Sequence, residues 1–342
     1  RSRWESACAV ITAWFDVARL KANGTGEPAA VPANPRRPEA KPIPLPPETT
    51  HSMTPGLADA AEIADAAGID VRRGVQFATP ASGPLGLDLY RPASSVGRET
   101  ETGPRRAAVV LVPGNGWRSV ERGSMARYAL DLAERGYVCI VPAYRGSDTA
   151  AFPAGIRDLK AAVRWIRAAS DAVGVDPARI GAFGHDAGAH LSVLAALTAN
   201  SEHFSPAPET VGRDVAAASD ALSAVVGVAG TYVFEHQPET ADLVAFLGGD
   251  RESAPDAWTR ASPSTYLDGE GGAGSRPPTL LLHGEEDAVV PAMASELFYD
   301  LLEERDVPAE CVVAADAGHD VHKTQRAFTL RWTEGFLDRH LR

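Results

Sequence analysis

The chain has 342 residues, of which 44% are hydrophobic and 23% charged, so it can form an ordinary globular protein with a sizeable core. Its net charge of −12 and the lack of Lys- or Arg-rich runs argue against nucleic acid or an anionic membrane as the main partner. The three cysteines, Cys8, Cys139 and Cys311, are far apart and form no C-x-x-C pair. They predict buried thiols rather than disulfides or metal ligands.

The N-terminal part of the chain differs from the rest. Residues 1–21 fit an amphipathic helix, and the Pro-rich stretch that follows predicts an extended linker or arm. We therefore expect residues 1–57 to form an N-terminal arm and residues 58–342 to form the folded domain. No apolar run is long enough to span a membrane. The apolar stretch near the N-terminus is interrupted by acidic residues and makes a poor signal peptide, which favours a cytoplasmic location over secretion.

From residue 74 onward, predicted strands and helices alternate. Residues 74–79 and 85–92 predict a hairpin, and continuous apolar strands are predicted at 106–114, 136–144, 179–184, 222–230, 277–284 and 309–315. Helices are predicted at 123–135, 156–166, 187–199, 293–304 and about 323–339. This alternation predicts an α/β fold with a mostly parallel sheet of about eight strands and helices on both faces. Ligands bind such sheets at the carboxyl ends of the strands.

The stretch GAFGHDAGAH, residues 181–190, places Asp186 in a tight turn between a strand and a helix. Gly184 and Gly188 flank it with the spacing of the G-x-S-x-G nucleophile elbow, in which serine occupies the centre. Aspartate tolerates the positive φ of an elbow better than most residues, and the N-terminus of the following helix favours an anion. Asp186 is therefore the candidate nucleophile.

Two later loops supply the remaining members of a catalytic triad. The α/β-hydrolase order is nucleophile, acid, histidine. Asp287 follows the next-to-last strand and His319 follows the last one, so the order of these residues fits. Asp287 is preferred over Glu285 and Glu286 because it lies deeper in its loop. His319 is preferred over His322 because it directly follows Gly318 at the strand end.

Metal binding has only a weak signal in the sequence. Asp320 and His322 lie close together in the chain, but they match no metal-ligand pattern, and we predict neither a metal nor a cofactor.

Several motifs resemble the esterase/lipase-like branch of the α/β-hydrolase family, which includes hormone-sensitive-lipase-like and feruloyl-esterase-like carboxylesterases. The matching stretches run from about residue 75 to the C-terminal end: VVLVPGNGWRS, VPAYRGSDTAAFPAGIRDLKAAVRWI, GHDAGAHL, SPSTYL and HGEEDAVVP. The resemblance implies an α/β-hydrolase fold and an oxyanion hole made by the backbone N–H groups of Asn115, Gly116 and Ala187. Pro113 and Asn115 replace a histidine and a glycine of the family pattern, and neither change removes these N–H groups.

The aspartate at the elbow leaves the reaction open. An attack by Asp186 on an ester carbonyl gives a mixed anhydride, which collapses backwards because carboxylate is the better leaving group. A carboxylate can instead displace a leaving group from a saturated carbon. Epoxide hydrolases and dehalogenases of this fold work in this way, and GHDAG resembles their elbow. The third possibility is an inactivated esterase that only binds its ligand.

Three further residues are candidates for contact with the substrate. Trp117 belongs to the esterase pattern, His185 adjoins the nucleophile, and Tyr232 could donate a proton to an epoxide. His185 could equally serve packing or tether the backbone, and Tyr232 could belong to the core. Residues 200–220 and 231–275 predict a small cap. The sequence thus predicts a hydrolase of a small ester-like substrate with an Asp186–His319–Asp287 triad, and it leaves the oligomeric state open.

Overall fold

The computed structural model describes residues 68–93, 105–268 and 276–342. Its centre is a sheet of eight strands: β1 (Ile69–Ala78), β2 (Leu85–Pro92), β3 (Arg106–Val112), β4 (Val138–Pro142), β5 (Val175–His185), β6 (Ala224–Val228), β7 (Thr279–Gly284) and β8 (Ala309–Ala314). The order is β1-β2-β4-β3-β5-β6-β7-β8, with β2 antiparallel to β1 and β4 and all other pairs parallel. The predicted sheet is confirmed. The predicted arm and domain boundary lie outside the described residues.

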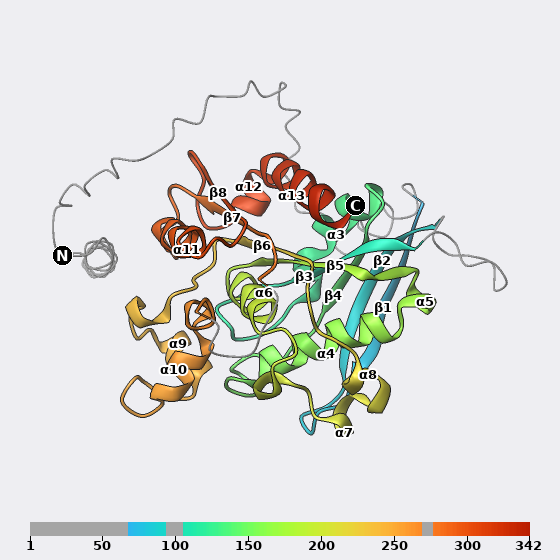
Figure 1. Ribbon diagram of the computed structural model, residues 1–342, viewed down its shortest axis with the longest axis horizontal. Coiled ribbons are helices and arrows are strands. Elements are labelled where there is room, and N and C mark those ends of the chain that lie inside the picture. Colours follow the sequence, from blue (N-terminus) through green and yellow to red (C-terminus); the bar gives the residue numbers. More distant parts are fainter. Residues whose placement is uncertain (1–67, 94–104, 269–275) are drawn as a thin grey trace.

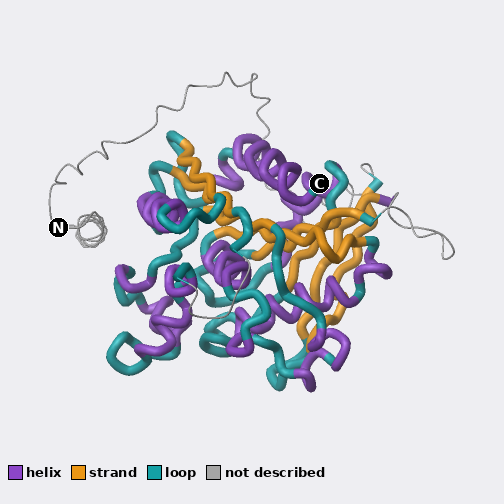
Figure 2. The backbone as a smooth tube through the Cα atoms, viewed as in Figure 1, coloured by secondary structure: helices purple, strands orange, loops and turns teal. Residues whose placement is uncertain are grey.

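Helices cover both faces of the sheet (Figure 1, Figure 2). One face carries α4 (Ala154–Ala168), α6 (Ala187–Leu197) and α11 (Met293–Glu303), and the other carries α3 (Ala126–Glu134) and α13 (Arg326–Leu341). Alternate residues of β3 face the two cores: Val110 and Val112 pack on the first side, and Val109 and Leu111 on the second. A strand that buries both faces must be apolar throughout, which explains the unbroken hydrophobic runs.

The insertions that follow α6 and β6 carry short helices. The first contains η3 (Glu202–Phe204), α7 (Pro208–Val211) and α8 (Arg213–Ala217), and the second contains η4 (Phe234–His236), α9 (Ala241–Leu247), α10 (Pro255–Ala261) and η5 (Pro263–Tyr266). Helix α9 packs against the loop after β3, where Phe246 stacks on Trp117 with ring centroids 5.1 Å apart. Arg118 Nε also donates to Asp242 Oδ1 at 2.7 Å. This second insertion is therefore the cap beside the site.

The remaining short elements are η2 (Arg122–Met125), α5 (Ser170–Val173) and α12 (Val321–Thr324). The predicted last helix is divided, because α12 ends before Gln325, whose φ of −118° and ψ of 48° are not helical, and α13 begins after it. The first strand begins five residues before its predicted start, and a register shift between Arg72 and Val75 marks an irregularity at Gly74. Sequence periodicity does not locate such local breaks.

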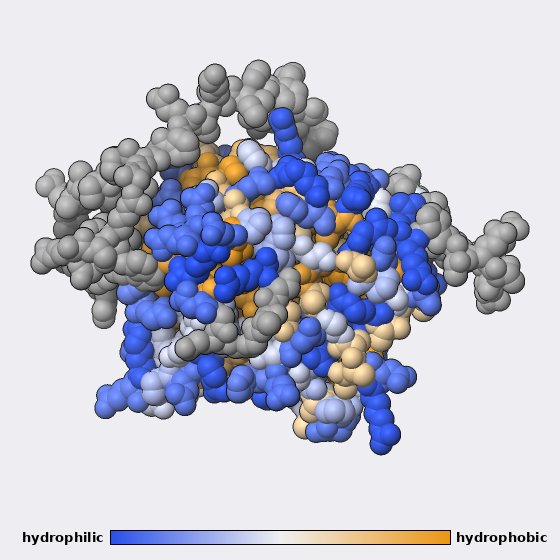
Figure 3. Space-filling model, in the orientation of Figure 1, coloured by the Kyte–Doolittle hydropathy of each residue, from blue (hydrophilic) through white to orange (hydrophobic). Residues whose placement is uncertain are grey.

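Two of the cysteines lie in strands as free thiols, Cys139 buried in β4 and Cys311 half-buried in β8. Polar residues cover most of the face shown in Figure 3. Within the described ranges, no helix combines the length and the apolar character needed to cross a membrane.

Candidate active site

The elbow is a strained turn between β5 and α6. Asp186 has φ 53° and ψ −122°, and its side chain leaves the turn at the carboxyl end of the strand. A Cβ on Gly184 would lie 2.1 Å from the carbonyl oxygen of Gly188, and one on Gly188 would lie 2.0 Å from that of Val112. No side chain fits at either place, which is the physical reason for the G-x-D-x-G spacing.

Two successive backbone N–H groups in the loop after β3 donate hydrogen bonds to one oxygen of the Asp186 carboxylate. Asp186 Oδ2 accepts hydrogen bonds from Asn115 N at 2.9 Å and from Gly116 N at 2.7 Å. Asn115, Gly116 and Trp117 all have positive φ, of 138°, 55° and 60°. Such backbone conformations are costly and concentrate at functional sites. Here they turn two successive N–H groups inward, so that two of the three predicted hole donors, Asn115 and Gly116, hold the aspartate itself.

Buried side chains hold this loop in place. Tyr144 Oη donates to the carbonyl oxygen of Pro113 at 2.6 Å. Trp117 Nε1 donates to His190 Nδ1 at 3.0 Å, and His190 Nε2, which then carries the proton, donates to the carbonyl oxygen of Ala261 at 2.7 Å. His190 thus connects the loop with the cap. Sequence reasoning missed Tyr144 and His190, since an isolated Tyr or His gives no signal of its own.

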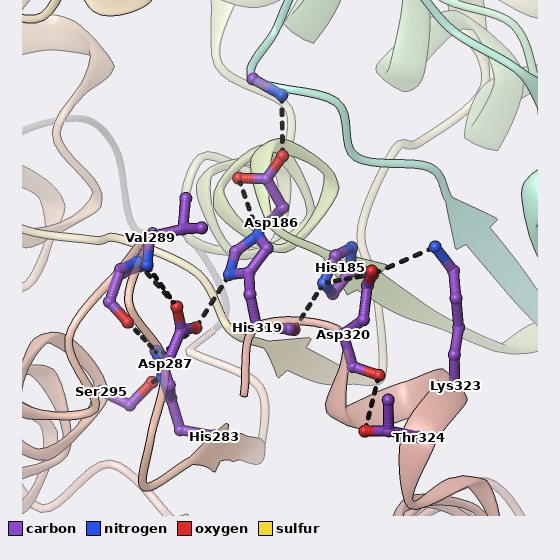
Figure 4. A network of polar contacts seen from close by, with 12 residues as sticks. His185, Asp186, His283, Asp287, Val289, Ser295, His319, Asp320, Lys323 and Thr324 are labelled. Atoms are coloured by element: carbon purple, nitrogen blue, oxygen red, sulfur yellow. Dashed lines mark hydrogen bonds and ion pairs between the residues drawn. The ribbon is translucent and has the colours of Figure 1, made fainter. Parts of the chain in front are cut away.

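On the other side of Asp186 lies an imidazole that is oriented by a carboxylate (Figure 4). His319 Nδ1 donates to Asp287 Oδ2 at 2.8 Å, and His319 Nε2 lies 3.9 Å from Asp186 Oδ1. That second distance is too long for a hydrogen bond. His319 Nε2 therefore faces the aspartate without a direct hydrogen bond to it.

Asp287 is held by four donors. Its Oδ1 accepts from Val289 N at 2.8 Å and from Val290 N at 2.9 Å, and its Oδ2 accepts from His319 and from His283 Nε2 at 3.1 Å. His283 Nε2 also lies 2.9 Å from the carbonyl oxygen of Val290, which can only accept, so Nε2 carries the proton and Nδ1 accepts from Ser295 Oγ at 2.8 Å. His283, in β7, is therefore a second side-chain partner of Asp287 that the sequence did not identify. Its position four residues before Asp287 was the available signal.

The electrostatics follow from these contacts. Burial alone would raise the pKa of Asp287, but the hydrogen bonds from His283 and His319 outweigh it, and the pKa falls well below its usual range. Burial alone would lower the pKa of His319, but the hydrogen bond and charge of Asp287, together with the charge of Asp186, raise it above 6.5. The site is thus built to stabilise an imidazolium between two carboxylates.

The other predicted residues lie as follows. Ala187 begins α6 directly after Asp186. Glu285 and Glu286 are exposed, whereas Asp287 is buried. Trp117 is buried, so its indole supports the loop more than it lines an open surface.

The contacts of His185 and Tyr232 lie with groups other than the Asp186 carboxylate. His185 Nε2 lies 3.0 Å from the carbonyl oxygen of His319, and this contact tethers the backbone. Tyr232 is fully buried, and its ring stacks on Phe298 of α11 with centroids 4.8 Å apart. This core position does not favour a role for Tyr232 in substrate contact. Val289, by contrast, is 61% exposed at the edge of the acid loop, and nothing in the sequence distinguished it.

An eight-stranded sheet of this order, with a nucleophile elbow after β5 and an acid and a histidine after β7 and β8, defines the α/β-hydrolase class. Residues 87–302 match the BD-FAE family model, and the chain belongs to this family.

Named relatives agree with this assignment. The chain is 32% identical over 232 residues to the probable carboxylic ester hydrolase LipM of Mycobacterium tuberculosis, covering 64% of this chain and 48% of LipM. It is 35% identical over 212 residues to esterase LipC of the same organism, covering 58% of this chain and 49% of LipC. The chain therefore spans about half the length of these curated relatives.

The fold also matches solved structures. The propionate-bound esterase Est2 of Thermogutta terrifontis superimposes with a TM-score of 0.63 at 24% identity, covering 80% of this chain and 94% of that one.

Proposed function

We propose that the chain is a hydrolase of small organic substrates and that it works through an ester formed on Asp186. The observation that carries this proposal is that the two oxygens of the Asp186 carboxylate have different surroundings. Oδ2 occupies both N–H groups of the hole, and Oδ1 faces His319 without a hydrogen bond to it. An ester carbonyl would need the same two donors, so the aspartate and such a substrate compete for them.

A saturated carbon that bears a leaving group makes no such demand. Asp186 Oδ1 attacks the carbon, the bond to the leaving group breaks, and the leaving group departs with the electron pair. The carbonyl oxygen of the resulting ester is Oδ2, which already lies in the hole. His319 Nε2 then takes a proton from water, and the hydroxide attacks Cγ of Asp186. Oδ2 carries the negative charge of the tetrahedral intermediate between two donors. The bond from Cγ to the alcohol oxygen then breaks, that oxygen takes the proton back from His319, and the Asp186 carboxyl group loses its proton to solvent.

The position of Tyr232 limits which leaving groups the substrate can carry. The sequence suggested this phenol as the acid that protonates an opened epoxide, but its side chain lies in the core. We therefore favour a leaving group that departs as a stable anion without a proton donor, such as a halide.

Carboxylic ester hydrolysis is the second candidate, because relatives that are 32% and 35% identical are named as ester hydrolases. It would require Asp186 to leave the hole and the anhydride intermediate to avoid backward collapse. An inactivated site that only binds its ligand is the third.

Isotope labelling separates these candidates. With short bromoalkanes as probes, a single turnover in heavy-oxygen water should place label in the peptide that contains Asp186, since water oxygen enters its carboxylate. A His319→Gln variant should instead accumulate the alkylated chain, because the second step lacks its base. Turnover without label at Asp186 contradicts the proposed route, and a chain that neither reacts nor becomes alkylated supports the inactivated site.

Restoring the family residue tests the surrounding machinery. Asp186→Ser should create activity on p-nitrophenyl acetate, because serine frees both hole donors and His319 can serve as its base. A folded variant that stays inert on this ester would mean that the hole or the histidine is misplaced for any acyl transfer.

A further inference from the structure

A second cluster of polar side chains lies behind the candidate catalytic histidine. It consists of His185 at the end of β5, Asp320 directly after His319, and His322 in α12. One potential ligand atom from each of the three lies within 4.8 Å of the others. The cluster shares no residue with the triad, although His185 adjoins it: His185 Nε2 lies 3.0 Å from the main-chain oxygen of His319, and the two rings have centroids 4.9 Å apart (Figure 4).

His322 makes the cluster unusual. Its side chain is 3% exposed, and neither Nδ1 nor Nε2 has a hydrogen-bond partner. Its ring instead packs against that of His185, with centroids 3.9 Å apart. A polar group buried without a partner costs about 1–3 kcal/mol. A buried imidazole without a hydrogen-bond partner has a ring nitrogen that is available to a metal ion.

We propose that His185, Asp320 and His322 bind a divalent transition-metal ion, with Zn²⁺ as the best match. Two imidazole nitrogens and one carboxylate oxygen form a ligand set that Zn²⁺ accepts and that Ca²⁺ and Mg²⁺, which prefer oxygen, do not. Asp320 is 51% exposed, so water can complete the coordination on its side. The sequence signal was weak because His185 lies 135 positions before Asp320, and only the sheet brings them together.

Lys323 competes for the same carboxylate. Its Nζ lies 3.0 Å from Asp320 Oδ1, whereas His185 Nε2 lies 4.0 Å from that oxygen. Zn–ligand bonds are about 2.0–2.2 Å long, so the ligand atoms must move closer together when the ion binds. Asp320, the exposed member, is free to rotate from Lys323 onto the ion. The ion would then brace the segment from which His319 projects.

Calorimetric titration of the full chain with Zn²⁺ tests the site. We expect the parent chain to bind one equivalent of Zn²⁺. In His322→Ala, which lacks a ligand, the affinity for Zn²⁺ should fall by more than the roughly tenfold to hundredfold that loss of a supporting partner costs. His203→Ala, which removes an exposed histidine on η3, is the matched control and should bind like the parent. Lys323→Met should bind Zn²⁺ more tightly, because it removes the competitor, and Mg²⁺ should not bind at this site.

A second variant covers the case in which His322→Ala does not fold. Asp320→Asn changes a half-exposed group and should fold like the parent, while it weakens Zn²⁺ binding and abolishes the advantage of Lys323→Met. Two results overturn the proposal: a parent chain that binds no Zn²⁺, or Zn²⁺ binding that is unchanged in Asp320→Asn and His322→Ala. Both readouts are binding measurements, so they stand whether or not the proposed reaction is correct.

Discussion

The two sides of the candidate site use different kinds of group: backbone N–H groups on one side and mainly side chains on the other. On the β3 side, two backbone N–H groups of Asn115 and Gly116 hold Asp186, and a run of positive φ angles aims them. On the β7 and β8 side, side chains do the work, with four hydrogen bonds converging on Asp287. The difference has a practical consequence. Substitution of a side chain can remove the acid or the histidine, but only a change to proline removes a backbone donor.

The largest expected effect tests the side-chain half. In the Asp186→Ser background, Asp287→Asn should lower kcat on p-nitrophenyl acetate by about 10³- to 10⁴-fold, because His319 loses the partner that sets its tautomer. Glu286→Gln, an exposed neighbour, is the matched control and should act like the background. A loss of less than about tenfold in Asp287→Asn would move the role to Glu285 or Glu286.

Substitution of His283 tests how much the hydrogen-bond network around Asp287 depends on its most deeply buried histidine. His283→Ala removes one donor from Asp287 and leaves Ser295 Oγ without its buried partner. We expect the free energy of unfolding to fall by about 1–3 kcal/mol for each buried group left unpaired. Urea denaturation of the parent and the variant measures it, and an unchanged midpoint would contradict the assigned network.

The pH dependence of stability tests the β3 side of the site, where the buried side chain of His190 supports the loop and can take up a proton. Burial lowers the pKa of His190 to about 4, against 6.5 for an ordinary histidine. Between these pH values the unfolded chain binds more protons than the folded one, so stability is full above pH 6.5 and falls as the pH drops toward 4. The contribution of one such group is at most about 1.4 kcal/mol per pH unit.

Denaturation at several pH values separates the share of His190 from that of other groups. His185, whose pKa is also lowered to about 4, adds to the parent's slope. His190→Gln should therefore reduce the slope without abolishing it. A slope identical to that of the parent would mean that His190 does not titrate with folding.

The smallest effect is expected where a side chain changes but its backbone donor stays. Asn115→Gly keeps the N–H group, relaxes the φ of 138° and removes the two exposed bonds from Nδ2 to Ser119, to Oγ at 3.0 Å and to the carbonyl oxygen at 3.5 Å. In the Asp186→Ser background, its esterase rate should change by less than about tenfold. A loss as large as that of Asp287→Asn would show that the Asn115 side chain itself takes part.

The fold was predictable because its signals are local. Continuous apolar runs such as 106–112 predict strands buried on both faces, and their alternation with amphipathic helices predicts the parallel sheet. The elbow was equally readable, because the spacing of Gly184 and Gly188 around Asp186 is a local sequence pattern, although the contact that requires glycine at 188 is with Val112 of β3. The divided C-terminal helix was not, because the break at Gln325 leaves no proline or glycine in the sequence.

By itself, then, the sequence determined the class of fold, the position of the elbow, and the order in which Asp186, Asp287 and His319 follow their strands. The tertiary structure alone decided which atoms meet. It placed Asp186 Oδ2 in the hole, put Tyr232 into the core, and brought His185 to His322. The physical reason is range. Strand and turn preferences depend on near neighbours, whereas these contacts are set by packing between strands that are distant in the chain and meet at one edge of the sheet.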